Sequence, residues 1–111
     1  MSARREAFVH ESDLRLEDGT DPAGPGAAVT AALCGHWEHE GPCRWPHNNA
    51  VRPGNGQTTF RTLFIARRAE EDDVRARIER ALRSAPAWSV LRSGPRPVAP
   101  PEQPLADRLA K

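Results

Sequence analysis

The sequence predicts a small α+β domain, with a mostly antiparallel sheet of about four strands and one helix packed on one face. The segment 58–66 has strong strand propensity, and the segment 70–84 has helical periodicity. Shorter strand-like segments precede and follow this pair, so the expected order is strand, strand or hairpin, strand, helix, strand. A chain of 111 residues is long enough for one small domain.

The first part of the chain predicts two strands separated by a loop. Residues 8–16 alternate loosely between apolar and polar side chains, which is typical of a half-buried strand. Residues 18–26 are dense in glycine and proline and therefore predict a loop. Residues 27–39 alternate again, with Val29 and Leu33 in one phase, and are expected to form the second strand.

The middle of the chain predicts a turn, an irregular arm and the clearest strand. The turn is expected at residues 40–42, which include adjacent glycine and proline. Residues 43–51 are expected to return as an irregular arm, because Pro46 has no amide hydrogen to donate to a sheet. After a loop at 52–57, residues 58–66 are rich in β-branched and aromatic side chains and predict a buried strand.

The segment 70–84 predicts the helix. It begins with four consecutive acidic residues, which interact favourably with the helix dipole. Val74, Ile78 and Leu82 form one apolar stripe, which we expect to pack on the strand that contains Phe60. Acidic side chains precede arginines by four positions at three places on the helix: Glu71–Arg75, Asp73–Arg77 and Glu79–Arg83.

The C-terminal part predicts a last strand at 88–92 and then a tail. Five prolines fall between residues 95 and 104 and argue against regular structure. We therefore expect a flexible N-terminus at 1–6, a single α+β domain at 7–93, and a disordered Pro-rich C-terminal tail at 94–111.

The overall composition argues against several classes of function. The formal net charge of +1 gives no general attraction to nucleic acid. The sequence has no apolar run long enough to span a membrane, and its N-terminus has no apolar signal core. A cytoplasmic location is therefore expected, where neighbouring cysteines are more often free or metal-bound than paired.

The fourteen residues that begin at Cys34 and end at His47 are the most unusual part of the sequence. They contain both cysteines, three of the four histidines and two of the three tryptophans. Thiolates and imidazoles are the ligands that zinc prefers. Cys34 and His36 would share one face of the expected strand, and the following turn would bring Cys43 and His47 toward that face. The predicted zinc ligands are therefore Cys34, His36, Cys43 and His47.

Two other interpretations of these residues stay open. Cysteine is among the most buried residue types, so the segment could contribute packing and surface side chains only. Alternatively, Cys34 and Cys43 could form a disulfide across a hairpin. The spacing does not match a two-cysteine, two-histidine zinc finger, whose cysteines lie two to four residues apart.

The same segment also predicts a binding surface. Its members are Trp37, Glu38, His39, Arg44 and Trp45. Tryptophan and arginine are enriched at the energetically dominant positions of protein interfaces. The tryptophans could equally belong to the core of a domain that has few other aromatic residues. Glu38 and Glu40 flank His39 and could act as a general base, although a solvated turn explains these carboxylates more simply.

These observations favour a small non-enzymatic binding or regulatory module with zinc in the 34–47 segment. The first alternative is a small metalloenzyme with an open three-ligand site. The second alternative is a nucleic-acid-binding accessory domain. We expect a protein partner, no membrane association and no nucleic acid, and a homodimer is a further alternative.

Overall fold

The computed structural model describes residues 4–34, 44–54 and 56–110. Four strands and three α-helices follow one another in the order β1 (Arg5–Leu16), α1 (Gly24–Cys34), β2 (His47–Pro53), β3 (Thr58–Arg67), α2 (Glu71–Arg83), β4 (Trp88–Arg96) and α3 (Gln103–Leu109). Short 3-10 turns at Arg68–Glu70 and Pro100–Glu102 lead into α2 and α3. None of the described helices is long and apolar enough to cross a membrane.

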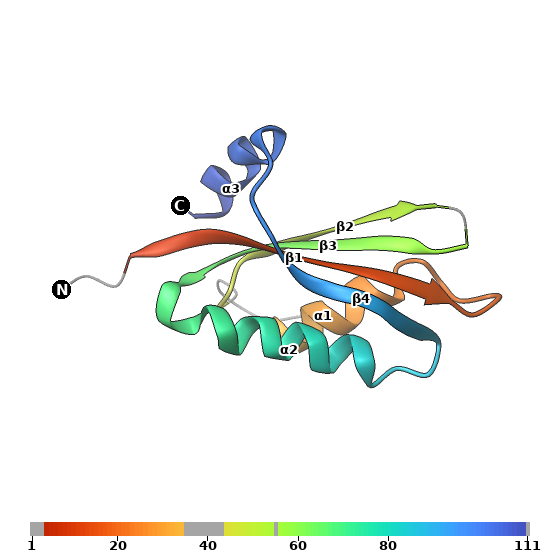
Figure 1. Cartoon of the computed structure of the whole chain (residues 1–111). Helices are drawn as coiled ribbons and strands as arrows, with labels where there is room; N and C mark the ends of the chain where they lie inside the picture. The colour runs from red at the N-terminus through yellow and green to blue at the C-terminus, as the bar shows by residue number, and fades with distance from the viewer. Residues whose placement is uncertain (1–3, 35–43, 55, 111) are drawn as a thin grey trace.

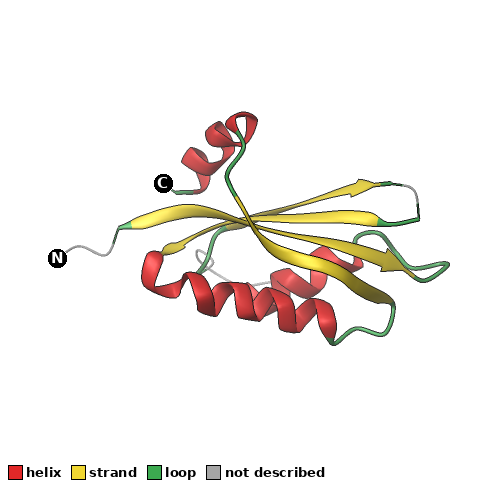
Figure 2. Cartoon of the chain, in the orientation of Figure 1, coloured by secondary structure: helices red, strands yellow, loops and turns green. Residues whose placement is uncertain are grey.

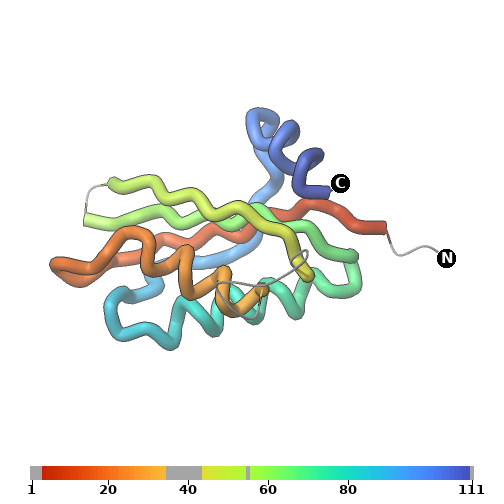
Figure 3. Tube along the Cα trace, turned by 180° about the vertical axis from the view of Figure 1, so that it is seen from behind, coloured from red at the N-terminus to blue at the C-terminus, as the bar shows by residue number. Residues whose placement is uncertain are grey.

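The four strands form one antiparallel sheet in the order β2-β3-β1-β4, which confirms the predicted sheet. Helices α1 and α2 cover one face, and α3 lies on the opposite side (Figures 1 and 2). Two β-α-β units interleaved in this way give the ferredoxin-like arrangement. Seen from behind, β2 forms one edge of the sheet with α1 beneath it (Figure 3).

Side chains from alternate strand positions build two apolar cores, one on each face of the sheet. The larger core lies under α1 and α2 and includes Phe8, Leu14, Val29, Leu33, Trp45, Phe60, Phe64, Val74, Ile78, Leu82 and Trp88. The smaller core joins Val9 and Leu63 of the central strands to Ala106 of α3. Both central strands are therefore buried on two faces.

Helix α2 confirms the predicted helix and its packing. Val74, Ile78 and Leu82 are buried in the same cluster as Phe60 and Phe64 of β3. The three predicted ion pairs are also present, Arg75–Glu71 at 2.9 Å, Arg77–Asp73 at 3.3 Å and Arg83–Glu79 at 2.9 Å. Each of these pairs stabilises the helix by a few tenths of a kcal/mol.

The prediction of a strand at 27–39 is wrong for residues 27–34, which belong to α1. The expectation of a single helix therefore does not hold. Val29 and Leu33 are four positions apart, a spacing that fits a helical stripe as well as a strand face. Between them, Ala31 and Ala32 would point to opposite faces of a strand, and alanine has the highest helix propensity. Pro25 fits within the first turn, where its missing amide hydrogen has no intrahelical acceptor.

The prediction of a disordered tail from residue 94 does not hold for residues 94–110. Strand β4 continues to Arg96, and α3 follows. Pro104 lies in the first turn of α3, where a missing amide hydrogen costs no helical hydrogen bond. Arg61 of β3 holds the segment by donating to both carboxylate oxygens of Glu102, at 2.8 and 2.7 Å, and to the carbonyl of Pro97 at 3.0 Å.

Strands β1 and β2 also differ in their bounds from the predicted segments. Strand β1 begins at Arg5, inside the expected flexible N-terminus. The irregular arm predicted at 43–51 is replaced in part by β2, which begins directly after Pro46 and ends at Pro53. A strand bounded by prolines at the edge of a sheet is compatible with their missing donors.

Candidate functional site

The predicted 34–47 site is only partly covered by the described residues. Cys34, Arg44, Trp45 and His47 are described, and His36, Trp37, Glu38, His39, Glu40 and Cys43 lie outside the described residues. Cys34 is the last residue of α1, so the strand-face argument that joined it to His36 does not apply to it. His47 is the first residue of β2.

The structure brings two of the four predicted zinc ligands together at the junction of α1 and β2. The Sγ atom of Cys34 lies 3.9 Å from Nδ1 of His47. Nδ1 is 3.1 Å from the carbonyl oxygen of Trp45, and Nε2 is 3.0 Å from the hydroxyl of Thr30. Because a carbonyl only accepts, Nδ1 carries the ring proton and Nε2 accepts from Thr30.

His47 is therefore held as a neutral imidazole. Burial lowers its pKa, and the hydrogen bond to the backbone at Trp45 opposes this shift without cancelling it. Cys34 is disulfide-bonded. Among the described residues, no group of three or more histidine, cysteine or acidic side chains could hold a metal.

Trp45 belongs to the core, and Arg44 to the surface above it. The tryptophan is only 2% exposed and packs in the larger cluster. The guanidinium of Arg44 lies 4.4 Å from the centre of the indole ring, and that of Arg77 lies 4.9 Å from it. The side chain of Arg44 is 66% exposed. The guanidiniums of Arg44, just before β2, and of Arg77 in α2 thus both make cation–π contacts with the buried indole of Trp45.

Glu70 is the nearest acidic partner of Arg44, but it is bound more closely by Arg67. Hydrogen bonds from Arg67 are the main reason that the pKa of Glu70 falls to about 2. Arg67 reaches this carboxylate at 3.2 and 3.3 Å, whereas Arg44 remains at 3.5 Å. Arg44 therefore has a loose ion pair and an exposed guanidinium.

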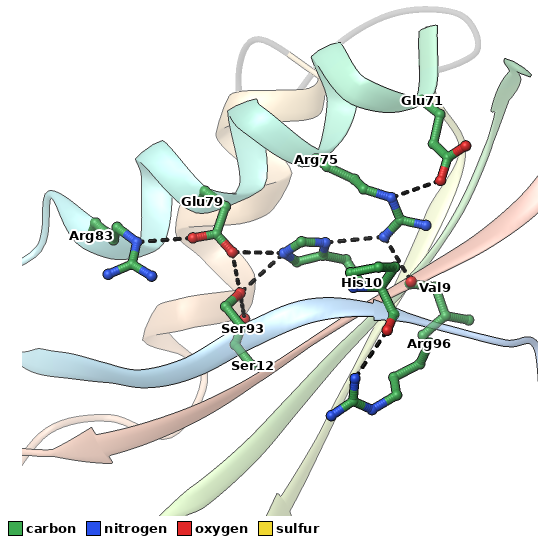
Figure 4. Close-up of polar contacts among 10 residues, drawn as sticks. Val9, His10, Ser12, Glu71, Arg75, Glu79, Arg83, Ser93 and Arg96 are labelled. Carbon is green, nitrogen blue, oxygen red and sulfur yellow. Dashed lines mark hydrogen bonds and ion pairs between the residues drawn. The ribbon is translucent and has the colours of Figure 1, made fainter. Parts of the chain in front are cut away.

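A second polar cluster, centred on His10, was not singled out by sequence reasoning (Figure 4). His10 is 4% exposed and lies on the helix-covered face of β1. Its ring contacts Glu79 and Arg75 of α2 and Ser93 of β4. The apolar–polar alternation of β1 places His10 on the same buried face as Phe8. No local sequence pattern identifies its partners, because they are distant in the sequence.

The protonation of His10 follows from its neighbours. Arg75 can only donate, so Nδ1 at 3.0 Å accepts and Nε2 carries the proton. Nε2 then donates to Glu79 at 2.8 Å, with Ser93 Oγ at 3.0 Å. The hydroxyl of Ser12 lies 2.7 Å from that of Ser93, which in turn donates to Glu79. Glu79 also accepts from Arg83 at 2.9 Å.

Burial is the main cause that lowers the pKa of His10, and Glu79 opposes it. Burial raises the pKa of Glu79, but hydrogen bonds from Ser93, His10 and Arg83 together lower it below its ordinary value. The cluster therefore contains a neutral imidazole and an ionised carboxylate whose hydrogen bonds are all made within the fold.

The His10 cluster does not have the geometry of a hydroxyl nucleophile and its base. In a serine–histidine–acid triad, the hydroxyl and the acid meet opposite nitrogens of the ring. Here Ser93 and Glu79 both lie within hydrogen-bonding distance of Nε2, and the guanidinium of Arg75 donates to Nδ1. The cluster instead ties β1, α2 and β4 together.

A shallow groove of about 460 Å³ lies on the second face of the sheet. Its walls include Arg52 of β2, Thr59 and Arg61 of β3, and Glu102. Single-stranded nucleic acid binds such a sheet face mainly by stacking bases on aromatic side chains. Among the described residues, the strands offer only aliphatic and polar side chains on this face, since the three phenylalanines pack in the core under α1 and α2.

Comparisons with protein-family models, curated proteins and solved structures gave no match to this chain.

Proposed function

We propose that this chain is a small binding module that recognises carboxylate groups of a protein partner through Arg44 and Arg77. The observation that carries the proposal is the stacking of both guanidiniums on the buried indole of Trp45, at 4.4 and 4.9 Å. We call this arrangement the Arg–Trp–Arg stack. It lies beside the junction of α1 and β2, and Arg44 and Trp45 are members of the binding surface that the sequence predicts.

The physical chemistry of the stack suits a carboxylate. A guanidinium binds a carboxylate with two parallel hydrogen bonds. Stacking on a rigid ring restricts each arginine before binding, so less side-chain entropy is lost when the partner arrives. The carboxylate of Glu70 is already bound by Arg67, so at Arg44 a partner carboxylate competes with the loose 3.5 Å contact. At Arg77 it competes with the partly exposed ion pair to Asp73 at 3.3 Å.

The proposed module is non-enzymatic. The titratable groups of the His10 cluster satisfy one another, and the buried imidazole is only 4% exposed. A cytoplasmic location remains a prediction from the sequence.

An NMR titration tests the proposal. Oligoglutamate peptide is added to the full chain while the arginine Nε–Hε signals are followed, with oligolysine peptide as the control ligand. We expect the signals of Arg44 and Arg77 to shift with oligoglutamate only. Arg44→Gln should weaken binding about tenfold, since one charge-assisted contact is lost. Arg108→Gln changes an exposed arginine on α3 and should bind as the wild type.

Two results would contradict the carboxylate proposal. The first is a set of shifts confined to Arg52 and Arg61 in the groove on the other face of the sheet. The second is equal affinity of the wild type and Arg44→Gln for oligoglutamate, with both proteins folded.

Zinc binding is a second candidate function, favoured by the 3.9 Å approach of Cys34 Sγ to Nδ1 of His47. Zinc binds the thiolate form of cysteine and an unprotonated imidazole nitrogen, so this candidate concerns the protein with its disulfide reduced and with Nδ1 of His47 deprotonated. Elemental analysis of untagged protein purified under reducing conditions should then find about one zinc per chain. His47→Asn should lose the metal, and Thr30→Ser should retain it. Metal-free wild-type protein whose melting curve does not respond to chelator would exclude the candidate.

A further inference from the structure

We propose that β2 is a dimerisation edge, at which two copies of this chain pair antiparallel about a two-fold axis. The two four-stranded sheets would then join into one continuous sheet. This inference concerns a different surface from the Arg–Trp–Arg stack and stands independently of the proposed function.

The two edges of the sheet are not equivalent. Strand β4 includes Pro95, which lacks an amide donor, and the charged side chains of Arg92 and Arg96. Proline and charge are the usual devices that prevent edge strands from pairing with other chains. Strand β2 has prolines only at its ends, Pro46 before it and Pro53 as its last residue, and Arg52 is its one charged side chain. The β2 edge is therefore the one that can pair.

The hydrogen bonding of β2 fixes which backbone groups face outward. The amide of Ile65 donates to the carbonyl oxygen of Pro46 at 2.9 Å, so these two residues form a hydrogen-bonded pair of the antiparallel ladder. Such pairs alternate along the strands. The residues of β2 whose backbone groups point toward β3 are therefore Asn48, Ala50 and Arg52, opposite Leu63, Arg61 and Thr59.

The remaining residues, His47, Asn49 and Val51, direct their N–H and C=O groups away from the sheet. Within the described part of the chain, these outward groups have no hydrogen-bond partner. Val51 is also 40% exposed, which makes it one of the two large hydrophobic side chains described as exposed. A strand that pairs with β2 would satisfy the backbone and cover this valine.

The sequence of β2 is complementary to itself when the two-fold axis passes through Ala50. Asn49 then forms a hydrogen-bonded pair with Val51 of the partner subunit, and Val51 with the partner's Asn49. Ala50 faces the partner's Ala50 in a non-hydrogen-bonded pair, where side chains approach most closely and small ones fit best. Arg52 faces the partner's Asn48, so no like charges meet.

Other registers fit less well. An axis through Asn49 would also pair outward-pointing residues, but it would place Arg52 opposite the partner's Pro46 and shorten the paired segment. An axis through Arg52 would place two arginines directly opposite each other, which is destabilising. An axis through Asn48 would move Ala50 opposite the partner's Pro46 and shorten the paired segment. The self-complementary register is the reason for assigning a second copy of this chain, rather than an unrelated strand, to this edge.

Helix α1 does not oppose the approach of a second copy. It lies beside β2, with the Asn49 side chain donating to the carbonyl of Gly26 at 3.2 Å. None of its eleven residues is charged, and its exposed positions include Ala27 and Ala31. Two copies of α1 brought near each other by the two-fold axis would meet without charge repulsion.

Cysteine cross-linking tests the register directly. In Ala50→Cys the two introduced thiols face each other across the axis, at a Cα separation of about 4.5 Å that a disulfide can bridge. We expect intact-mass measurement after mild oxidation to show a covalent dimer. Asn48→Cys and Arg52→Cys are matched controls on the same strand and should remain uncross-linked alone but cross-link when mixed. Failure of Ala50→Cys to cross-link, or equal cross-linking of all three variants, would overturn the proposal.

Sedimentation measures the association without a covalent bond. Because a strand pair is a small interface, the wild type is examined up to about 500 µM, and we expect a concentration-dependent dimer. Val51→Pro removes an outward donor and should be monomeric, with its circular dichroism unchanged. Ala50→Glu, which opposes two carboxylates at the axis, should also be monomeric, whereas Leu91→Thr on β4 should dimerise as the wild type. A monomeric wild type over this range would contradict the proposal, even if an unrelated peptide binds to β2.

Discussion

At the scale of single residues, His10 shows how one buried polar side chain joins three elements. Its Nδ1 atom accepts from Arg75, and its Nε2 atom donates to Glu79 beside Ser93. A buried polar group that loses its partner costs about 1–3 kcal/mol, and more if the remaining group is charged.

We therefore expect His10→Ala to lower the free energy of unfolding by about 3 kcal/mol. The variant leaves a cavity and removes partners from Arg75 and from the carboxylate of Glu79. Urea denaturation measures the change. Ser89→Ala, at an exposed position of β4, is the control and should change stability by less than about 0.5 kcal/mol. A similarly small loss for His10→Ala would show that the cluster does not stabilise the fold.

His10 and His47 also determine how the free energy of unfolding depends on pH. Burial lowers the pKa of His10 and of His47, so the unfolded chain binds these protons at a higher pH than the folded chain. Stability should be constant above the unfolded pKa of about 6.5 and fall as the pH decreases below it, with a slope of at most about 1.4 kcal/mol per pH unit for each histidine.

Urea denaturation between pH 7.5 and 5 measures this slope before the carboxylates begin to titrate. The variant His47→Gln should show a shallower slope than the wild type, because one of the two linked protonations is removed. A wild-type stability that stays constant or rises toward pH 5 would disagree with the assigned neutral imidazoles.

At the scale of elements, the C-terminal segment depends on Arg61. Its guanidinium reaches Glu11 at 2.7 Å in addition to Glu102 and the carbonyl of Pro97. Hydrogen bonds from Arg61 to Glu102 are the main cause that raises the pKa of the arginine, so the pair remains ionised. α3 itself has only seven residues and would not be stable alone.

We expect Arg61→Gln to increase hydrogen exchange of the α3 amides while leaving those of α2 protected. The global stability should fall by about 2 kcal/mol, in keeping with the loss of several charge-assisted hydrogen bonds at a partly buried side chain. Arg92→Gln, an exposed arginine on β4, is the control and should leave α3 unchanged. If α3 exchanges equally in the wild type and in Arg61→Gln, then apolar contact alone holds the segment.

The individual strands and helices also show which parts of the fold could be predicted from the sequence. Strand β3 and helix α2 could be predicted because their patterns are strong within one short segment, as the buried stripe of Val74, Ile78 and Leu82 confirms. Helix α1 could not, since its alanines fit either periodicity and its buried face is set by packing against α2. The ordered C-terminal segment depends on the contact between Arg61 and Glu102. These residues are 41 positions apart, so no local sequence pattern predicts the contact.

At the scale of the whole molecule, the fold places the described parts of the 34–47 segment against α1 and α2. The sequence predicts the approach of Cys34 to His47 from a strand face at 34–36, but in the structure this approach joins the end of α1 to the start of β2. The stacking of Arg77 on Trp45 could not be predicted from the sequence, because it requires α2 to pack beside the start of β2. The contact of two arginines with one buried ring thus depends on tertiary structure, and it carries the proposed function.

The most direct test is a double-mutant cycle of oligoglutamate affinity on the wild type, Arg44→Gln, Arg77→Gln and the variant with both substitutions. Since both guanidiniums lie on Trp45, we expect each single change to weaken binding about tenfold, with a coupling of at least about 0.5 kcal/mol between them. Binding should be lost in the double variant, with an unchanged melting temperature. If the folded double variant binds oligoglutamate as tightly as the wild type, then the Arg–Trp–Arg stack is not the recognition surface.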